Sequence, residues 1–497
     1  MKSFQVIGGP VCVNRIRLTR HTSLAGKRWQ TAVARPRTWN TANQRRPQIH
    51  HSDPKTSGRR YLAAESRNVA KPSGVTTTPE GSLVFDADLL NSYGVLIEGH
   101  EALTRDPLWL RDCCKCEACV NQSSRQKQFE TTDIPEDIKV RDMEVIGDTI
   151  RFTWENDVPG FAADHETVLQ LRDIVSLAVD SNEFEYRNTH KGHHVFWKKD
   201  ELEADLKVVD FDDYVNKEEA LLSTLQALRK YGIAFVQNVP ESEQSVVDIA
   251  LRIGPLKNTF YGYTWDVRSV PDAKNVAYTH GHLGFHMDLL YMRQPPRLQL
   301  LHCVRSSAHG GASLFTDSYR AVSDICDVDQ KYFKTLNSSR TLFEYHNDGH
   351  HYSHAHPIVR MSLRGRKRGY QSSFDRREER MPTAIAAVHY SPPFQGPLSY
   401  STPAAVRGWY SAMKMLKAKI EQPDMIYQRQ MKPGECVIFD NQRVLHARTA
   451  FVPGDAGKER WLRGAYLDDD PWMSKLRVLE DKYGAEPFRE HATKPAS

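Results

Sequence analysis

The residues best suited to chemistry in this chain are two histidines and an aspartate that lie far apart in the sequence. His286 and Asp288 stand two positions apart in the run Phe285-His286-Met287-Asp288, and residues i and i+2 of a β-strand point to the same face. One metal ion could take both side chains, with His446 supplied by a distant strand. Two histidines and one carboxylate on one face of an octahedral ion are the ligand set of non-haem Fe(II) oxygenases. The spacing therefore indicates an iron centre with open coordination positions.

An arginine after the second histidine points to a co-substrate. Arg460 begins the strand-like run 460–466, and its guanidinium could hold the far carboxylate of a 2-oxo acid through two parallel hydrogen bonds. A His-x-Asp pair by itself is weak, because such pairs arise by chance and are then ordinary strand residues. The context favours the metal, since the tight turn Gly310-Gly311 precedes one strand and the buried run 434–439 leads into His446.

A second set of potential metal ligands consists of clustered cysteines. Four of the eight cysteines fall within seven positions, at Cys113, Cys114, Cys116 and Cys119. Disulfides are rare in reducing compartments, so this clustering favours a metal site in a matrix or cytosolic protein.

The first fifty residues differ in composition from the rest of the chain. Residues 1–52 carry ten Lys and Arg side chains and no acid before Asp53, and Ser, Thr, Ala and Asn are frequent among the others. An Arg-rich, acid-free and hydroxyl-rich start is typical of a mitochondrial transit peptide, with a disordered basic tail as the alternative. We expect residues 1–80 to be a transit peptide and linker, and the protein to be mitochondrial (matrix), with a cytoplasmic location as the alternative.

The charge and hydropathy of the chain argue against two classes of partner. The net charge of +5 comes from the basic start, and the remainder carries a slight excess of acids, so no nucleic-acid partner is expected. No uncharged apolar run approaches the roughly 18 residues that a membrane helix needs, so no membrane insertion is expected.

The elements that must position these residues are mostly short strands. Residues 83–200 are predicted to form a small β-rich domain, with a hairpin turn at Gly147-Asp148 and a helix at 165–179. Its expected strands lie at 83–85, 95–97, 138–140, 143–146 and 150–154.

Residues 205–490 are predicted to form a second, mainly β domain. A helix at 217–231 should end at Gly232, and a helix at 402–421 should begin at Thr402. The core stripe of this second helix is expected at Val406, Tyr410, Met413, Leu416 and Ile420. Strands are expected at 233–236, 275–288, 297–304, 312–316, 342–346 and 434–439. Metal ligands on separated short strands suggest a double-sheet jelly roll.

Several stretches resemble the gamma-butyrobetaine dioxygenases and their relatives the trimethyllysine dioxygenases, in an order and spacing that hold over most of the chain. They are Asn275-Val276-Ala277-Tyr278-Thr279, His286-x-Asp288, Leu300-Leu301-His302-Cys303, Phe439-Asp440-Asn441 and Arg443-Val444-Leu445-His446. The resemblance implies a mainly β fold with flanking helices, the double-stranded β-helix (jelly roll). It also implies Fe(II), with 2-oxoglutarate and O2 as co-substrates, ascorbate as an additional cofactor, and a homodimer.

The resemblance also assigns roles to the residues of the metal pattern. His286, Asp288 and His446 become the iron ligands at the catalytic centre. Arg460 becomes the 2-oxoglutarate clamp, and Ser313, after the double glycine, adds a hydroxyl to the same carboxylate.

The cysteine cluster gains a specific interpretation in the same way. The family binds zinc through a C-x-C-x-x-C spacing and a later histidine, which match Cys114, Cys116, Cys119 and His165. A Cys3His set without an open position is a structural zinc site. Cys113 stands where the family has no cysteine, and we expect it to point away.

Aromatic residues give the expectation about the substrate. A trimethylammonium group donates no hydrogen bonds and is bound by the faces of aromatic rings. Rings that match the family's cage are Tyr261, Trp265, Tyr278 and Tyr466, although such residues are more often core. Asn275 matches a family residue near the substrate carboxylate. A second family contact, in an Asn-Asn stretch, is replaced here by the run 390–393 (Tyr-Ser-Pro-Pro).

These observations together predict the hydroxylation of gamma-butyrobetaine to L-carnitine, with a small quaternary-ammonium compound as the partner. The alternatives are the hydroxylation of trimethyllysine in the same pathway, a non-catalytic binding protein that kept the fold, and a module whose zinc site is its main function. The histidine-rich tract 346–356 and the histidines at 190–194 are interpreted as surface loops and turns, not as metal sites.

Overall fold

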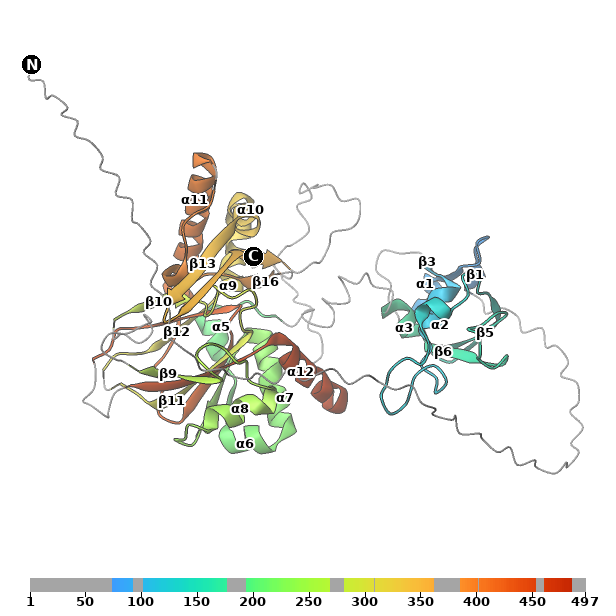
Figure 1. Ribbon diagram of the computed structural model, residues 1–497, viewed down its shortest axis with the longest axis horizontal. Helices are drawn as coiled ribbons and strands as arrows, with labels where there is room; N and C mark the ends of the chain where they lie inside the picture. The colour runs from blue at the N-terminus through green and yellow to red at the C-terminus, as the bar shows by residue number, and fades with distance from the viewer. Residues whose placement is uncertain are drawn as a thin grey trace, which may run out of the picture. The chain divides into compact units, whose positions relative to one another are not determined.

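The computed structural model describes residues 74–92, 102–176, 194–268, 281–307, 309–361, 385–400, 402–452 and 460–484 (Figure 1). The expected transit peptide therefore lies almost entirely outside the described residues, as do the strand expected at 95–97 and two of the three histidines at 190–194. We refer to residues 74–176 as the N-terminal segment and to residues 194–484 as the C-terminal segment. The domain limits 83–200 and 205–490 stay a prediction. Among the described helices, none is long and apolar enough to cross a membrane.

Two small antiparallel sheets, β1-β2-β3 and β4-β5-β6, build the N-terminal segment. The strands are β1 (Val75–Thr77), β2 (Leu83–Asp86), β3 (Ala102–Arg105), β4 (Val140–Ile146), β5 (Thr149–Trp154) and β6 (Glu166–Gln170). The helices are α1 (Ala87–Ser92), α2 (Pro107–Asp112) and α3 (Leu171–Ser176), with a 3-10 turn η1 (Thr131–Asp133). Gly147, with a φ of 57°, and Asp148 form the expected turn between β4 and β5. Phe85 and Phe152 lie in one buried core that both sheets share.

The helix expected at 165–179 is wrong over its first part. Residues 166–170 form β6, which pairs with β5, and only then does α3 begin. Thr167 and Leu169 are buried while Glu166 and Val168 are exposed, which is the alternation of a strand on a core. Residues 166–170 form a strand because they pair with β5. The spacing of apolar residues in the sequence does not reveal this pairing.

Two sheets form the core of the C-terminal segment, one with the order β10-β19-β12-β17 and one with the order β7-β8-β18-β11-β20-β9. Their strands are β7 (Val208–Asp210), β8 (Ile233–Gln237), β9 (Thr264–Arg268), β10 (Leu283–His286), β11 (Leu298–Arg305), β12 (Ser313–Asp317), β17 (Tyr427–Arg429), β18 (Glu435–Asp440), β19 (Val444–Arg448) and β20 (Trp461–Leu467). Leu301 and Phe439 of the larger sheet pack against Phe315 of the smaller one. This is the double-sheet arrangement that the short strands predict, and of the strand expected at 275–288 the structure describes only β10.

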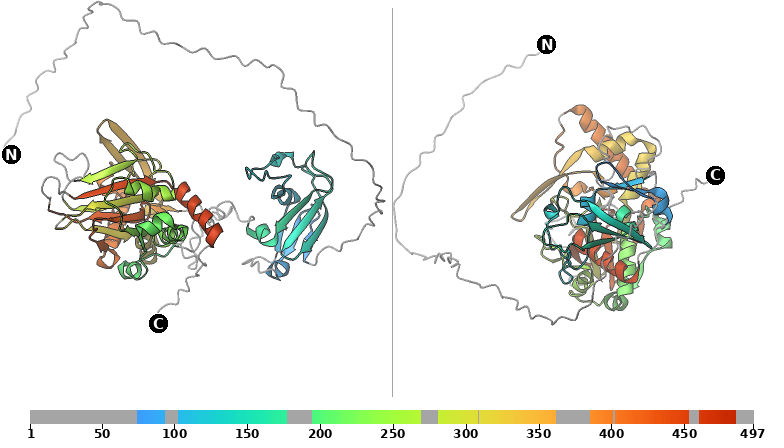
Figure 2. Two further views of the ribbon diagram at one scale, coloured as in Figure 1. Left: turned by 90° about the horizontal axis from the view of Figure 1, so that it is seen from below. Right: turned by 90° about the vertical axis from the view of Figure 1, so that its right-hand side faces the viewer.

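Helices cover the outer face of the six-stranded sheet, as two further views show (Figure 2). They are α6 (Phe211–Asn216), α7 (Glu218–Tyr231), α8 (Ser245–Ile253) and α12 (Asp469–Tyr483). Leu225, Ile249 and Leu476 of this layer share a core with Leu300 of β11. Gly232, with a φ of 77°, ends α7 where the sequence predicts. The expectation of a mainly β domain with few helices therefore understates the helical content.

The described part of the C-terminal segment has six further helices and 3-10 turns. In chain order they are α5 (Lys199–Ala204), α9 (Ser318–Val328), α10 (Gln330–Ser338), η4 (Pro392–Phe394), α11 (Pro403–Ile420) and η5 (Pro423–Met425). The side chain of Thr402 caps α11 by accepting a hydrogen bond from the backbone N–H of Ala405 at 3.2 Å. Leu416 and Ile420 are buried as predicted, but Tyr410 is 62% exposed. Trp409 and Ala412 are buried instead, because α11 turns that face toward α9 and α10.

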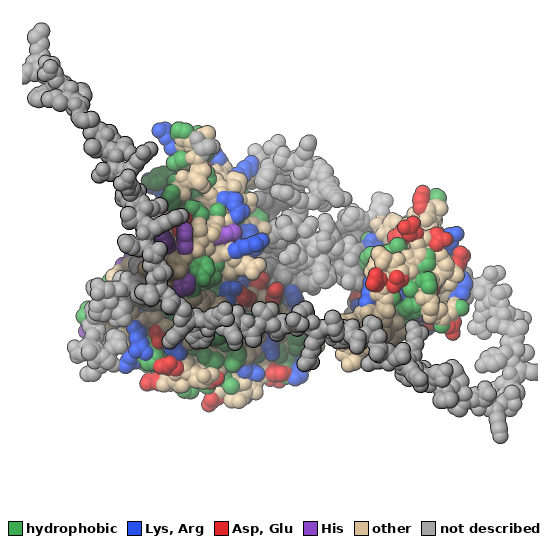
Figure 3. Space-filling view, in the orientation of Figure 1, with side chains coloured by type: hydrophobic (Ala, Val, Ile, Leu, Met, Phe, Trp, Pro, Cys, Tyr) green, Lys and Arg blue, Asp and Glu red, His purple; other side chains and the backbone are tan. Residues whose placement is uncertain are grey.

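The histidine-rich tract is a β-hairpin, which corrects the expectation of a loop. Its strands are β13 (Arg340–Asn347) and β14 (His350–Pro357), and a shorter pair, β15 (Val359–Met361) and β16 (Ile385–Val388), follows. His346 and His351 stand directly opposite each other with ring centroids 4.5 Å apart. Figure 3 shows His side chains gathered on this part of the surface. The tight turn at Asp348 and Gly349, both with positive φ, lets the two polar strands pair.

Candidate active site

Three potential metal ligands meet where the end of β10 lies beside β19. His286, the last residue of β10, stands directly opposite His446 of β19, and their ring centroids are 4.1 Å apart. Asp288 follows just beyond the strand end. The ligand atoms of all three residues lie within 4.8 Å of one another. The structure therefore brings together the three residues that the sequence singles out, from distant parts of the chain.

The two carboxylate oxygens of Asp288 have different surroundings. Oδ1 lies 3.4 Å from Nε2 of His286, on the side of the metal ligands. Oδ2 accepts hydrogen bonds from Nε2 of Gln299 at 2.8 Å and from the hydroxyl of Tyr466 at 2.7 Å. Gln299 on β11 and Tyr466 on β20 are directly opposite each other, so both reach the same oxygen. Outer contacts of this kind orient a ligating carboxylate and leave Oδ1 for a metal.

The pKa shifts of Asp288 and His446 suit metal binding. Burial, together with the nearby His286, lowers the pKa of His446 to about 3. Burial alone would raise the pKa of Asp288, but its interactions with His286, His446 and Tyr466 lower it overall. Nδ1 of His286 donates to the carbonyl of Gly284 at 2.9 Å, which leaves Nε2 for the metal. Neutral imidazoles and an ionised carboxylate are the ligating forms, and this donor set fits Fe(II).

Arg460 lies buried at the start of β20, beside the double-glycine turn. A Cβ atom on Gly311 would approach Cδ and Nε of Arg460 to 3.3 Å and Oγ of Ser307 to 2.5 Å, and the φ of Gly311 is +71°. Glycine at 311 therefore leaves room for the guanidinium. Burial lowers the pKa of Arg460 to about 10, so it remains cationic at neutral pH. Such a buried cation suits a carboxylate ligand.

A second buried arginine, Arg448, interacts with this cation and lies opposite Ser313. Ser313 is buried at the start of β12 and stands directly opposite Arg448 of β19. Burial and the charge of Arg460 lower the pKa of Arg448 to about 10. Arg448 was not singled out from the sequence, although its position two residues after His446 places it on the same face of β19.

Two of the expected cage residues lie face to face beside the metal ligands. The rings of Trp265 and Tyr466 stack with centroids 5.1 Å apart, and Tyr466 is the residue that donates to Asp288. A Cβ atom on Gly464 would come within 2.4 Å of the Trp265 ring, so glycine at this position lets the indole lie on β20. Tyr261 lies near a neighbouring tyrosine, with its hydroxyl 3.5 Å from that of Tyr291.

The other two expected substrate residues, Asn275 and Tyr278, lie outside the described residues. Tyr261 belongs to a larger aromatic group that the sequence does not single out. Its other members are Phe260, Tyr291, Tyr345, Tyr352 and Phe394.

The run in which the chain departs from the family pattern lies directly against the metal motif. The carbonyl of Tyr390 accepts a hydrogen bond from the backbone N–H of Met287, between the two ligands of the His-x-Asp pair, at 2.8 Å. Ser391 is 1% exposed, and within the described part of the structure its hydroxyl has no hydrogen-bond partner.

The cysteine cluster of the N-terminal segment forms a separate metal-ligand group. Nε2 of His165 lies 3.6 Å from Sγ of Cys114, 3.3 Å from Sγ of Cys116 and 3.4 Å from Sγ of Cys119. Cys113 is not part of this group and packs against the N-terminal core. Three thiols and one imidazole at a common point fit zinc.

A carboxylate and an arginine support this group from behind. Nδ1 of His165 lies 2.6 Å from a carboxylate oxygen of Asp157, which also pairs with the fully buried Arg111. Nη1 of Arg111 reaches Sγ of Cys119 at 3.3 Å. A carboxylate behind a ligating histidine fixes the ring and its tautomer, and the arginine offsets thiolate charge.

Parts of both segments match known protein families. Residues 196–466 match the taurine catabolism dioxygenase TauD, TfdA family, and residues 98–165 match the gamma-butyrobetaine hydroxylase-like N-terminal family. The first match spans more than half of the chain and includes the residues that converge at the end of β10. The chain therefore belongs to the TauD, TfdA family and is a 2-oxoglutarate-dependent dioxygenase.

Curated relatives support the resemblance found in the sequence. The chain is 34% identical to dioxygenase str8 of Strobilurus tenacellus, over 75% of this chain and 84% of that protein. It is 30% identical to gamma-butyrobetaine dioxygenase of Pseudomonas sp. (strain AK-1), over 75% and 90%. It is 28% identical to mitochondrial trimethyllysine dioxygenase of Rattus norvegicus, over 75% and 82%.

Proposed function

We propose that the protein hydroxylates gamma-butyrobetaine to L-carnitine, using Fe(II), 2-oxoglutarate and O2. The observation that carries the proposal is the pair Trp265 and Tyr466. An aromatic face suited to a trimethylammonium group stands one hydrogen bond from the metal carboxylate Asp288. Two relatives named for trimethylammonium substrates, at 30% and 28% identity, support the substrate class.

In this proposal His286, Asp288 and His446 hold Fe(II), which supplies the oxidising chemistry when 2-oxoglutarate and O2 are present. Gln299 and Tyr466 hold Oδ2 of Asp288, so its Oδ1 keeps one direction toward the ion. Arg460 pairs with the far carboxylate of 2-oxoglutarate, with the hydroxyl of Ser313 beside it. Ascorbate would act only as an auxiliary reductant.

The protein then selects the reacting carbon by position. Trp265, Tyr466, Tyr261 and Tyr278 cage the ammonium end, and Asn275 binds the substrate carboxylate. Holding both ends of the substrate leaves one methylene facing the iron. Orientation of this kind, without acid–base chemistry at the substrate, determines which hydrogen is lost.

Trimethyllysine is the second candidate substrate, because the family's Asn-Asn contact is replaced by a run that starts at Tyr390 and includes Ser391. This run contacts the metal motif through the backbone of Met287. In this proposal the departure from the family pattern therefore affects how the end of the substrate opposite the ammonium group is bound. A longer substrate with an amino-acid head would meet a serine hydroxyl at that end.

One experiment separates these functions. Purified protein with Fe(II), 2-oxoglutarate and O2 is given gamma-butyrobetaine or trimethyllysine, and succinate and hydroxylated product are measured by mass spectrometry. We expect coupled product from gamma-butyrobetaine. Turnover of trimethyllysine alone would replace the proposal with its alternative, and no turnover of either would reject both proposed substrates.

We further propose a structural zinc ion at Cys114, Cys116, Cys119 and His165. A closed set of four protein ligands supports a structural role and argues against zinc binding as the main function. We also propose that residues 1–80 direct the protein to the mitochondrial matrix, which fusion of this segment to a fluorescent reporter would test. Light scattering on the purified chain would test the homodimer.

A further inference from the structure

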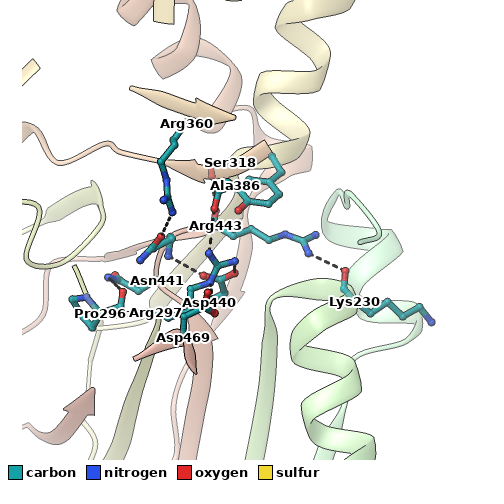
Figure 4. Close-up of polar contacts among 12 residues, drawn as sticks. Lys230, Pro296, Arg297, Ser318, Arg360, Ala386, Asp440, Asn441, Arg443 and Asp469 are labelled. Atoms are coloured by element: carbon teal, nitrogen blue, oxygen red, sulfur yellow. Dashed lines mark hydrogen bonds and ion pairs between the residues drawn. The ribbon is translucent and has the colours of Figure 1, made fainter. Parts of the chain in front are cut away.

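Four consecutive buried polar residues form the turn between β18 and β19, just before the ligand His446. They are Asp440, Asn441, Gln442 and Arg443, each at most 8% exposed. Figure 4 shows how their contacts spread to other parts of the C-terminal segment. Asp440 pairs with Arg297 at 2.6 Å, and Arg443 pairs with Asp317 at 2.8 Å. Gln442 donates to the carbonyl of Pro295 at 3.0 Å.

Asn441 differs from its neighbours because it binds a metal ligand. Its Oδ1 accepts a hydrogen bond from the backbone N–H of Asp288 at 3.0 Å, and its Nδ2 donates to the carbonyl of Asp288 at 3.2 Å. The same Nδ2 donates to the carbonyl of Pro296 at 3.2 Å. One fully buried amide therefore pairs with both backbone groups of Asp288, as a neighbouring strand would.

Asp288 needs such a partner because its strand has already ended. β10 stops at His286, so no ladder bond is available for the backbone of Asp288. Buried backbone groups without a partner are costly, at about 1–3 kcal/mol each. The next residue, Leu289, is 3% exposed and has a φ of +62°, a region that residues other than glycine rarely adopt. Such a conformation persists only where the surroundings impose it.

We propose that Asn441 is a positioning residue for the iron site, which fixes Asp288 through its backbone and holds the chain in the left-handed bend at Leu289. The inference rests on the proposed iron ligands. The hydrogen bonds from Gln299 and Tyr466 fix the rotation of the Asp288 carboxylate. The hydrogen bonds with Asn441 fix the position of the Asp288 backbone, from which the side chain projects. The turn that carries Asn441 also leads into the strand of His446, so one short segment fixes the positions of two ligands relative to each other.

The test measures metal binding and stability on the full chain. Metal-free wild type, Asn441→Ala and Gln442→Ala are titrated with Mn(II), which thiolates bind poorly, and free Mn(II) is followed by electron paramagnetic resonance. Gln442→Ala is the matched control, because it removes a side-chain bond to a backbone carbonyl from the same turn without touching Asp288. We expect the Mn(II) dissociation constant of Asn441→Ala to rise about 10–100-fold, as other outer-sphere changes do. Gln442→Ala should stay within about threefold of wild type, and urea unfolding reports the stability of each apo protein.

The outcomes separate this inference from the iron site itself. Wild type that binds no Mn(II) would overturn both. Wild type that binds, with Asn441→Ala folded and binding equally well, would overturn the positioning role alone, as would equal weakening in Gln442→Ala. If the cavity left by Ala prevents folding, Asn441→Leu fills that volume without the hydrogen bonds. Failure of both variants to fold would assign Asn441 to the fold and reject the proposal.

Discussion

The cysteine cluster of the N-terminal segment and the triad of the C-terminal segment differ in where their ligands come from and in what they leave open. Three of the four ligands in the first group lie within six residues, at 114–119, and the fourth, His165, closes it. The triad joins His286 and Asp288 at the end of one strand to His446 on its neighbour, and it has three ligands among the described residues. A closed local group can hold a fold together, whereas an open group leaves positions for reactants.

The two groups also use their supporting contacts differently. Behind His165, Asp157 and Arg111 come from the same small segment and support one ligand each. Behind Asp288, support arrives from β11, β20 and the turn before β19. The open site therefore depends on the register of the whole larger sheet, and the closed site does not.

The largest expected effect is the loss of activity when one triad ligand is removed. His286→Ala should lower coupled succinate and product formation by more than the roughly 10–100-fold that outer contacts are worth, while zinc content and the circular dichroism spectrum stay unchanged. His351→Ala, in the hairpin, is the control and should remain active. Unchanged activity in His286→Ala would mean that the iron site is misassigned.

Removal of a thiol should produce the opposite pattern. Cys116→Ser is expected to lose its zinc, measured by elemental analysis, and to destabilise the N-terminal segment by about 4 kcal/mol or more, as the loss of a metal site does. Its Mn(II) affinity at the triad should match that of wild type. Cys113→Ser is the control and should keep its zinc. Retention of zinc by Cys116→Ser would show that Cys116 is not a ligand.

Within the open site, the ring of Trp265 and the hydroxyl of Tyr466 should affect different steady-state kinetic constants. Trp265→Leu removes one cage face worth about 0.5–2 kcal/mol and should raise KM for gamma-butyrobetaine about 2–30-fold. Tyr466→Phe keeps the ring but removes one of the two hydrogen bonds to Oδ2 of Asp288, and should lower kcat about tenfold with little change in KM. A rise in KM alone for Tyr466→Phe would place its role in the cage only.

The smallest effect concerns the sheet beneath the open site. Burial lowers the pKa of His302 on β11 from 6.5 to about 4, and neither ring nitrogen has a hydrogen-bond partner within the described residues. In the unfolded chain His302 becomes protonated below about pH 6.5. In the folded chain it stays neutral until about pH 4. Stability should therefore fall as the pH falls through this window, by up to about 1.4 kcal/mol per pH unit.

Urea unfolding at pH 7 and pH 5 measures this term. His302→Leu should lose less stability than wild type between the two pH values, because an apolar side chain takes up no proton. The same pH dependence in both proteins would show that His302 makes no such contribution.

The pair His286-x-Asp288 and the cysteine cluster can be recognised from residue types and short spacings, whereas the choice of Cys114, Cys116, Cys119 and His165 as zinc ligands comes from the family resemblance. The helices α7 and α11 could be predicted because Gly232 and Thr402 mark their ends. In the sequence, Asn441 stands out only as part of a stretch that matches the family. Its role depends on a contact with Asp288, which is distant in the sequence.

The residues that were missed depend on strand register. Gln299 is a polar residue in a mostly apolar strand, which is a usable signal, but only its pairing opposite Tyr466 shows that it reaches Asp288. The whole of β6 is predicted as the first part of a helix for the same reason, since its pairing with β5 is a long-range property. Tyr466 was predicted from its ring alone, and its hydroxyl has a second role that position in the sequence does not reveal.

Gly464 has a consequence for how this active site could change over evolutionary time. It is neither a proposed metal ligand nor a proposed substrate-binding residue, yet its missing Cβ is what allows the indole of Trp265 to lie on β20. Gly464→Ala would add a single methyl group and displace the largest ring of the cage. We therefore expect substrate preference to change through a mutation that alters the identity of no proposed ligand and no proposed cage residue, but only the position of one ring.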